Sequence, residues 1–145
     1  MTHTFRTHSP AETQKVGVQI GQRLKPGDVV GLIGDLGVGK TCLTQGIACG
    51  VGIGKDQIVN SPSYILINQY AGEIPIYHID LYRLNRLEEI VDLGLEEYLE
   101  GDGICVIEWA DRMEELLPEN AIHIRITGED EFTRTIEWSV VTNLV

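Results

Sequence analysis

A glycine-rich segment between a short apolar run and a helical pattern constrains this chain more than any other feature. Residues 34–41 read Gly-Asp-Leu-Gly-Val-Gly-Lys-Thr and match the pattern G-x-x-x-x-G-K-[ST]. The apolar run at 28–33 predicts a buried strand, and residues 41–49 have helical character and are followed by Gly50 and Gly52, which we expect to end the helix. A strand, a glycine-rich loop and a helix in this order are typical of a phosphate-binding loop.

The chemistry of such a loop predicts which residues bind a nucleotide. Glycines allow successive N–H groups to point at one centre, and the start of the helix adds a partial positive charge there. Lys40 is expected to reach the β- and γ-phosphates and so to act in catalysis, and the Thr41 hydroxyl to bind Mg²⁺. The predicted nucleotide-binding residues are Leu36, Gly37, Val38, Gly39, Lys40, Thr41 and Cys42. The chain has no Asn-Lys pair of the kind that Ras-type guanine recognition uses, which favours ATP.

Two carboxylates are candidates for the second half of a magnesium site. Glu108 directly follows the apolar run Ile104–Ile107, the form in which a Walker B acid ends a buried strand. Asp80 ends a more alternating strand. Glu108 is thus the favoured Walker B acid and Asp80 its rival, and two carboxylates near one phosphate site would suit a division in which one mainly binds the metal and the other places metal-bound or attacking water. Acids exposed to solvent at strand ends are the alternative for both.

Two further residues near these acids have more than one interpretation. His78 would suit a general base, although a lone histidine in a strand is more often structural. Trp109 follows Glu108 and is either a packed aromatic or a contact surface.

The remaining pattern predicts one α/β domain over residues 1–145. Ser9 and Pro10 begin a helix whose apolar residues recur up to Leu24, and a helix over 87–100 is expected to break at Gly94. Hairpins are predicted at 64–79 and 122–141, and a short helix at 111–117. Because strands and helices interleave, we expect a three-layer fold with a mainly parallel central sheet and antiparallel flanking strands, including the terminal hairpin at its edge.

Charge and composition exclude several function classes. The net charge is −11, yet residues 1–72 carry +2 and residues 73–145 carry −13, with 12 acids and one arginine in 88–119. Tight unaided binding to nucleic acid is therefore not expected, because a phosphate backbone attracts basic surfaces. No apolar run is long enough to span a membrane, and residues 1–6 lack the apolar core of a signal peptide. We expect a cytoplasmic protein whose three cysteines stay reduced.

Together the motifs resemble the TsaE family, also called YjeE or YdiB. The matching segments are the loop at 34–41, Asn-Ser-Pro-Ser-Tyr at 60–64, Tyr-His-Ile-Asp-Leu-Tyr-Arg at 77–83, Asp-Leu-Gly at 92–94 and Val-Ile-Glu-Trp at 106–109. Their order and spacing cover nearly the whole chain. The family often has threonine at the positions of Cys42 and Ser63, and neither difference removes a group that nucleotide binding needs.

The resemblance implies a P-loop NTPase fold and an ATPase of low intrinsic activity that uses ATP and Mg²⁺. Such proteins work with the TsaD and TsaB proteins in threonylcarbamoyladenosine modification of tRNA and reset that pair between cycles, without transferring the group themselves. By position, Lys40 and Thr41 serve phosphate and Mg²⁺, Glu108 matches a metal ligand and Asp80 an acid needed for hydrolysis. Ser61, Ser63, Tyr64 and Trp109 become candidates for a switch or partner contact, and the base is expected near Arg134.

Two other functions remain open at this stage. One is a small-molecule P-loop kinase, although the chain has only seven arginines for a phosphate-covering lid. The other is a nucleotide-binding interaction module that does not hydrolyse, against which the two acids argue. Phosphorylation of a nucleoside or metabolite with saturation kinetics would indicate the first, whereas slow turnover in isolation would look the same as the second.

Overall fold

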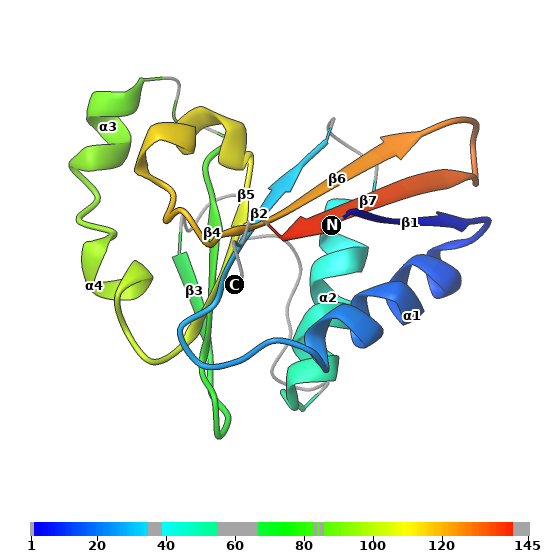
Figure 1. The fold of residues 1–145 in the computed structure, drawn as a ribbon, viewed down its shortest axis with the longest axis horizontal. Coiled ribbons are helices and arrows are strands. Elements are labelled where there is room, and N and C mark those ends of the chain that lie inside the picture. The colour runs from blue at the N-terminus through cyan, green and yellow to red at the C-terminus, as the bar shows by residue number, and fades with distance from the viewer. Residues whose placement is uncertain (1, 35–38, 55–66, 83, 85, 141–145) are drawn as a thin grey trace.

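A computed structural model describes residues 2–34, 39–54, 67–82, 84 and 86–140 of the 145 residues. The strands in it are β1 (Thr2–Thr7), β2 (Val29–Ile33), β3 (Ile67–Tyr70), β4 (Ile76–Asp80), β5 (Ile104–Glu108), β6 (Ile122–Gly128) and β7 (Arg134–Val140). The helices are α1 (Pro10–Gly21), α2 (Lys40–Val51), α3 (Leu87–Val91), α4 (Glu96–Leu99) and the 3-10 helix η2 (Ala110–Leu116). Figure 1 shows their arrangement.

The strands form one seven-stranded mixed sheet in the order β1-β7-β6-β2-β5-β4-β3. Its centre is parallel, because β6, β2, β5 and β4 each run alongside the next in the same direction. Antiparallel strands flank that centre, with β3 on β4 at one edge and β7 and β1 at the other. The expected α/β fold with a parallel core and antiparallel edges is thus confirmed, but the sheet as a whole is mixed, with three parallel and three antiparallel pairings.

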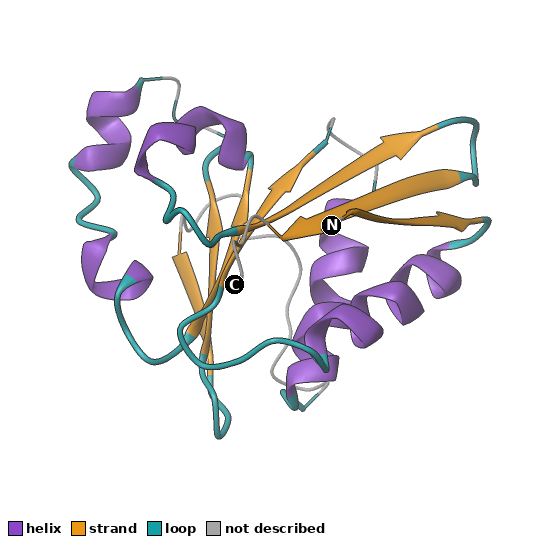
Figure 2. Cartoon of the chain, viewed as in Figure 1, coloured by secondary structure: helices purple, strands orange, loops and turns teal. Residues whose placement is uncertain are grey.

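Different helices cover the two faces of the sheet (Figures 1 and 2). Alternate residues of β5 supply the two cores, since Ile104 and Val106 pack with α1 and α2, and Cys105 and Ile107 pack with α3 and η2. All five residues of β5 are buried, as expected for a central strand with helices on both sides. By this alternation, the side chain of Glu108 lies on the face of α1 and α2.

Close glycine contacts join α1 to α2. Each helix carries two buried or half-buried glycines four residues apart, namely Gly17 and Gly21 on α1 and Gly46 and Gly50 on α2. A Cβ atom on Gly46 would lie 2.2 Å from the carbonyl oxygen of Gln14, and one on Gly17 would lie 2.5 Å from that of Leu43. The two backbones therefore touch without side chains between them, which fixes the helix that follows the phosphate-binding loop.

Several local predictions need correction. Gly50 lies inside α2 and not at its end, which comes at Val51 with Gly52 in the left-handed region at φ 119°. The terminal hairpin does not form the edge of the sheet, because β6 pairs with β2 in parallel and β1 pairs with the outer side of β7. Strand β1 was not predicted, although the alternating threonines and Phe5 suit a strand. The short helix predicted at 111–117 is present as the 3-10 helix η2 at Ala110–Leu116.

Other predicted elements are confirmed. α1 begins after Ser9, whose side chain accepts a hydrogen bond from the backbone N–H of Glu12. The predicted helix over 87–100 does break, with Gly94 at φ 66° between α3 and α4. No helix in the described part of the chain is long and apolar enough to cross a membrane.

Candidate functional site

Lys40 stands at the first turn of α2, where the phosphate-binding pattern predicts it. The helix is preceded by Gly39 at φ 108°, a left-handed conformation that favours glycine. Lys40 is buried, with 4% of its surface exposed, and its Nζ donates a hydrogen bond of 2.6 Å to the carbonyl oxygen of Gly34. The same nitrogen lies 3.5 Å from the centre of the Trp109 ring. The hydrogen bond thus holds the Lys40 side chain against Gly34, the first residue of the glycine-rich loop.

The other predicted loop residues divide into two groups. Thr41 and Cys42 follow Lys40 in the first turn of α2, and both are partly buried. The Cys42 thiol donates a hydrogen bond of 3.1 Å to the carbonyl oxygen of Pro10. Burial raises the pKa of this thiol, and a hydrogen bond with the backbone of Gln14 acts in the opposite direction. Leu36, Gly37 and Val38 lie outside the described residues.

Asp80 and Glu108 come together at the ends of two neighbouring parallel strands. They are register partners in the β4–β5 pair, and only 5% and 3% of their surfaces are exposed. Both are therefore buried, in contrast to the alternative of solvent-exposed acids at strand ends. A buried carboxylate costs several kcal/mol unless hydrogen bonds or a cation compensate it, which makes two adjacent ones a candidate metal and catalytic centre.

The segment that follows Asp80 is tied to the site by hydrogen bonds. The Oδ1 atom of Asp80 accepts a bond of 2.9 Å from the backbone N–H of Tyr82, which fixes the orientation of the carboxylate. Arg112 on η2 donates from Nη1 to the carbonyl oxygens of Leu81 and Leu84, at 3.0 and 3.1 Å, and also to that of Tyr82. Sequence reasoning missed Arg112, because no motif marks a side chain that binds backbone.

Trp109 is part of the site and adopts an uncommon backbone conformation. Its φ of 63° and ψ of 38° place it in the left-handed region, which costs free energy for a residue other than glycine. Two cations lie near its ring, with Nζ of Lys40 at 3.5 Å and Cζ of Arg112 at 4.8 Å from the centroid, and the centroid of the Tyr82 ring lies 5.4 Å away. The interpretation as a packed aromatic is therefore supported, because the ring packs on the lysine itself, and a role as a partner contact stays a prediction.

His78 occupies β4 two residues before Asp80 and is 1% exposed. Its Nε2 contacts Oε2 of Glu108, and its Nδ1 lies 3.2 Å from the Tyr70 hydroxyl. Both ring nitrogens are thus engaged by protein groups, which favours the structural interpretation over a general base.

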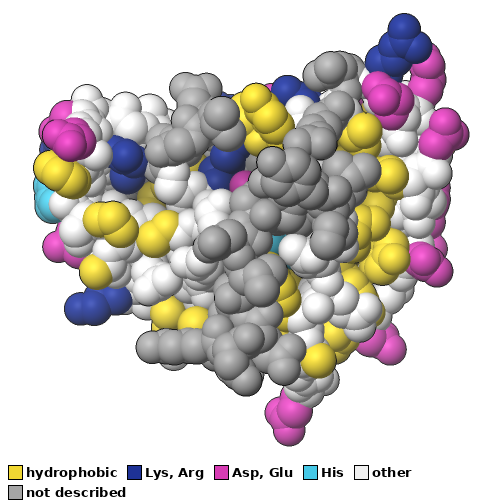
Figure 3. All heavy atoms as spheres, turned by 180° about the vertical axis from the view of Figure 1, so that it is seen from behind, with side chains coloured by type: hydrophobic (Ala, Val, Ile, Leu, Met, Phe, Trp, Pro, Cys, Tyr) yellow, Lys and Arg dark blue, Asp and Glu magenta, His cyan; other side chains and the backbone are white. Residues whose placement is uncertain are grey.

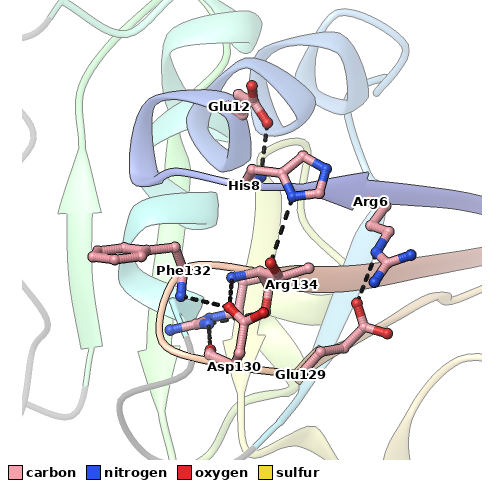
Figure 4. A network of polar contacts seen from close by, with 8 residues as sticks. Arg6, His8, Glu12, Glu129, Asp130, Phe132 and Arg134 are labelled. Carbon is pink, nitrogen blue, oxygen red and sulfur yellow. Dashed lines mark hydrogen bonds and ion pairs between the residues drawn. The ribbon is translucent and has the colours of Figure 1, made fainter.

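An open pocket of about 340 Å³ lies beside the start of α2, between α1 and the β6–β7 turn. Its lining residues are Ser9, Pro10, Thr13, Gly39, Cys42, Glu131, Phe132 and Arg134. Figure 4 shows the turn that forms one wall, where Asp130 accepts hydrogen bonds from the backbone N–H groups of Phe132 and Thr133. These two hydrogen bonds lower the pKa of the Asp130 carboxyl, and the bond from Thr133 has the larger effect. The pocket lies where the resemblance places the nucleotide base.

The structure leaves part of the predicted site untested. Ser61, Ser63 and Tyr64, the candidates for a switch or partner contact, lie outside the described residues. Within the described residues no three His, Cys, Asp or Glu side chains cluster so as to hold a metal by themselves.

Comparisons with known proteins agree on one family. The family model described as "Threonylcarbamoyl adenosine biosynthesis protein TsaE" matches residues 7–136. The tRNA threonylcarbamoyladenosine biosynthesis protein TsaE of Bacillus subtilis is 45% identical over 142 residues, covering 96% of this chain and 86% of the relative. That of Treponema pallidum is 40% identical over 120 residues, covering 83% and 87%. A crystal structure of Bacillus subtilis YdiB superposes with a TM-score of 0.83 at 38% identity, covering 99% of this chain and 88% of that one.

Proposed function

The chain belongs to the TsaE family, and from this we propose that it binds and hydrolyses ATP as an accessory protein for threonylcarbamoyladenosine modification of tRNA. The observation that carries the ATPase part is that Lys40 Nζ lies 3.5 Å from the ring of Trp109, the residue that directly follows the buried carboxylate of Glu108. Asp80 and Glu108 end adjacent parallel strands on the face of α2, and Lys40 begins that helix. This is the arrangement by which P-loop NTPases bind phosphates and Mg²⁺.

The phosphate side of the proposed site consists of the loop and the start of α2. Lys40 Nζ now donates to the carbonyl oxygen of Gly34 and would turn to the β- and γ-phosphates. The contact with the Trp109 ring keeps the lysine side chain near the loop. Backbone N–H groups at the N-terminus of α2 add donors for phosphate oxygens.

The metal side would consist of Thr41 and Glu108. The Thr41 hydroxyl and the Glu108 carboxylate suit Mg²⁺, which prefers oxygen ligands. Mg²⁺, when bound, neutralises charge that develops on the phosphates during transfer. Asp80, whose orientation the Tyr82 N–H fixes, would accept a proton from or position the attacking water.

The pocket beside α2 is the proposed base site. Phe132, with 59% of its surface exposed, offers a ring on which a purine can stack. Arg134 lines the same pocket and donates to the carbonyl oxygens of Asp130, Thr133 and Glu131, which makes it part of a rigid turn (Figure 4).

Charge supports action through partner proteins. Residues 88–119 carry 12 acids, and the space-filling view in Figure 3 shows acidic side chains along the edge of the molecule on the side of α3 and α4. Such a surface repels tRNA but suits basic residues of a protein. We therefore propose that the TsaD and TsaB proteins are the partners, that ATP hydrolysis resets that pair between cycles, and that the protein works in the cytoplasm.

The test is ATP hydrolysis in Mg²⁺ by this protein alone and after addition of the purified TsaB–TsaD pair, with Lys40→Ala as control. We expect slow hydrolysis that the pair strongly stimulates and that Lys40→Ala abolishes. Hydrolysis that ignores the pair would contradict the accessory role, and phosphorylation of a small-molecule acceptor would identify a P-loop kinase instead.

A further inference from the structure

Three buried polar side chains from three neighbouring strands form a continuous chain behind the proposed metal site. They are Tyr70 on β3, His78 on β4 and Glu108 on β5, with 3%, 1% and 3% of their surfaces exposed. The Tyr70 hydroxyl lies 3.2 Å from Nδ1 of His78, and Nε2 of His78 contacts Oε2 of Glu108. Polar groups this deeply buried cost free energy unless they are paired, so the chain of contacts is required for the fold to keep them there.

The register of the strands explains why the three meet. His78 pairs with Val106 on β5, so that Glu108 is its diagonal neighbour two residues on. On the other side, His78 pairs with Asn68 of β3, and Tyr70 is again the diagonal neighbour. All three side chains lie on the sheet face that α2 covers, because residues two apart in a strand share a face. This chain of contacts thus leads from Tyr70 on the antiparallel edge strand β3 to the carboxylate of Glu108, the register partner of Asp80.

Hydrogen-bond chemistry sets the direction of the chain. An ionised carboxylate can only accept, so Nε2 of His78 must carry the hydrogen that it shares with Glu108. In the neutral ring, Nδ1 is then an acceptor and Tyr70 must be the donor. Burial raises the pKa of Tyr70, the Glu108 charge adds to this, and a hydrogen bond with Asn68 opposes it. The phenol therefore keeps its hydrogen and can hold the ring in this tautomer.

We propose that His78 is a positioning residue that holds Oε2 of Glu108 and so directs the second carboxylate oxygen, Oε1, to the magnesium ion, while Tyr70 fixes the His78 tautomer. The proposal rests on the proposed function, since it assumes that Glu108 is a metal ligand. Partners of this kind orient ligands, and their loss typically weakens metal affinity by about 10- to 100-fold.

The first test reads the tautomer and does not depend on a nucleotide or metal. Long-range ¹H–¹⁵N NMR on the full chain labelled at histidine separates a ring nitrogen that bears hydrogen from one that does not. The proposal predicts hydrogen on Nε2 and none on Nδ1 of His78, with a shift of Nδ1 in Tyr70→Phe. Hydrogen on Nδ1 alone would overturn the assigned direction of the chain.

The second test measures two quantities: the Mg²⁺ concentration that gives half of its effect on ATP affinity, and the ATP affinity in EDTA, where no Mg²⁺ is available. Replacement of His78 by alanine should raise the Mg²⁺ concentration for half-maximal effect by about 10-fold or more, and leave ATP affinity in EDTA within about twofold of wild type. His78→Gln, which retains an N–H donor, should recover part of the loss. Tyr70→Phe should give a smaller change in the same direction. His123→Gln on β6 is the matched control, since it makes the same substitution elsewhere in the sheet.

A cycle with Glu108→Gln separates positioning from general damage to the fold. If His78 acts through Glu108, its replacement in the Glu108→Gln background should change the Mg²⁺ requirement no further. An equal effect in both backgrounds, or an unchanged requirement in His78→Ala and Tyr70→Phe, would overturn the proposal. If ATP binding to the wild type ignores Mg²⁺, the proposed function fails instead, and the tautomer measurement still decides whether the chain of contacts exists.

Discussion

The two sides of the candidate site are built by different means. The phosphate side depends on backbone, because Gly17 and Gly46 let α1 and α2 touch and so fix the helix that begins at Lys40. The metal side depends on side chains, because Asp80 and Glu108 are held by hydrogen bonds at the ends of β4 and β5. A substitution of the glycines that pack α1 on α2 should therefore damage the fold, and one of the two carboxylates should damage chemistry while the fold persists.

Replacement of Gly46 by alanine should have the largest effect. In a free helix alanine is favoured over glycine by up to about 1 kcal/mol, but here the new Cβ would lie 2.2 Å from the Gln14 carbonyl oxygen. We expect a loss of about 3 kcal/mol and a fall in Tm of about 10 °C, measured by thermal denaturation. Gln19→Ala, on the exposed side of α1, is the control. Unchanged or higher stability of Gly46→Ala would show that the helices are not fixed by this contact.

Replacement of Asp80 by asparagine should slow ATP hydrolysis without changing the stability of the fold. We expect kcat for ATP hydrolysis to fall by about 100-fold, with Tm and ATP affinity close to wild type, because the amide cannot accept a proton from water. Stopped-assay kinetics and calorimetry on the same sample measure both quantities. Equal losses in binding and turnover would make Asp80 a plain ligand and weaken the distinction between the two sides.

Replacement of Phe132 by alanine tests the base pocket next to the phosphate side. A lost stacking contact of about 1.4 kcal/mol should weaken ATP binding by about tenfold. Binding of inorganic triphosphate, which has no base, should not change. A parallel loss for both ligands would mean that Phe132 supports the loop and not the base.

Charge neutralisation on α4 should have the smallest effect and should spare both sides of the site. Glu96, Glu97 and Glu100 are exposed and belong to the acidic segment. The triple change to glutamine should weaken binding to the TsaB–TsaD pair by about threefold at low salt and hardly at all at high salt. ATP binding by the protein alone should stay the same. Unchanged partner affinity at low salt would exclude docking through these residues.

The sequence predicts the backbone-defined motif better than the contacts around it. The pattern at 34–41 places Lys40 at the start of a helix because glycine spacing and helix chemistry are local. The paired glycines of α1 and α2 were missed, since close approach of two helices appears only in three dimensions. The parallel pairing of β6 with β2 was missed for the same reason, because a hairpin pattern does not specify the neighbour on its other side.

The metal side was predicted as residues but not as an arrangement. Asp80 and Glu108 follow recognisable strands, yet their register partnership depends on which strands become neighbours. The contact between His78 and Glu108 spans 30 residues of sequence, and no spacing rule connects them. The left-handed backbone conformation of Trp109 could not be predicted either, because nothing in the neighbouring sequence distinguishes it from a residue in the β region.

The most direct test of the two-sided site is calorimetric titration of ATP in Mg²⁺ and in EDTA. We compare the wild type with Lys40→Ala and Glu108→Gln. We predict that Lys40→Ala weakens ATP binding by about 100-fold or more in both buffers. Glu108→Gln should match the wild type in EDTA and lose only the gain in affinity from Mg²⁺. Wild-type affinity in Lys40→Ala, or a full response to Mg²⁺ in Glu108→Gln, would contradict the two-sided site.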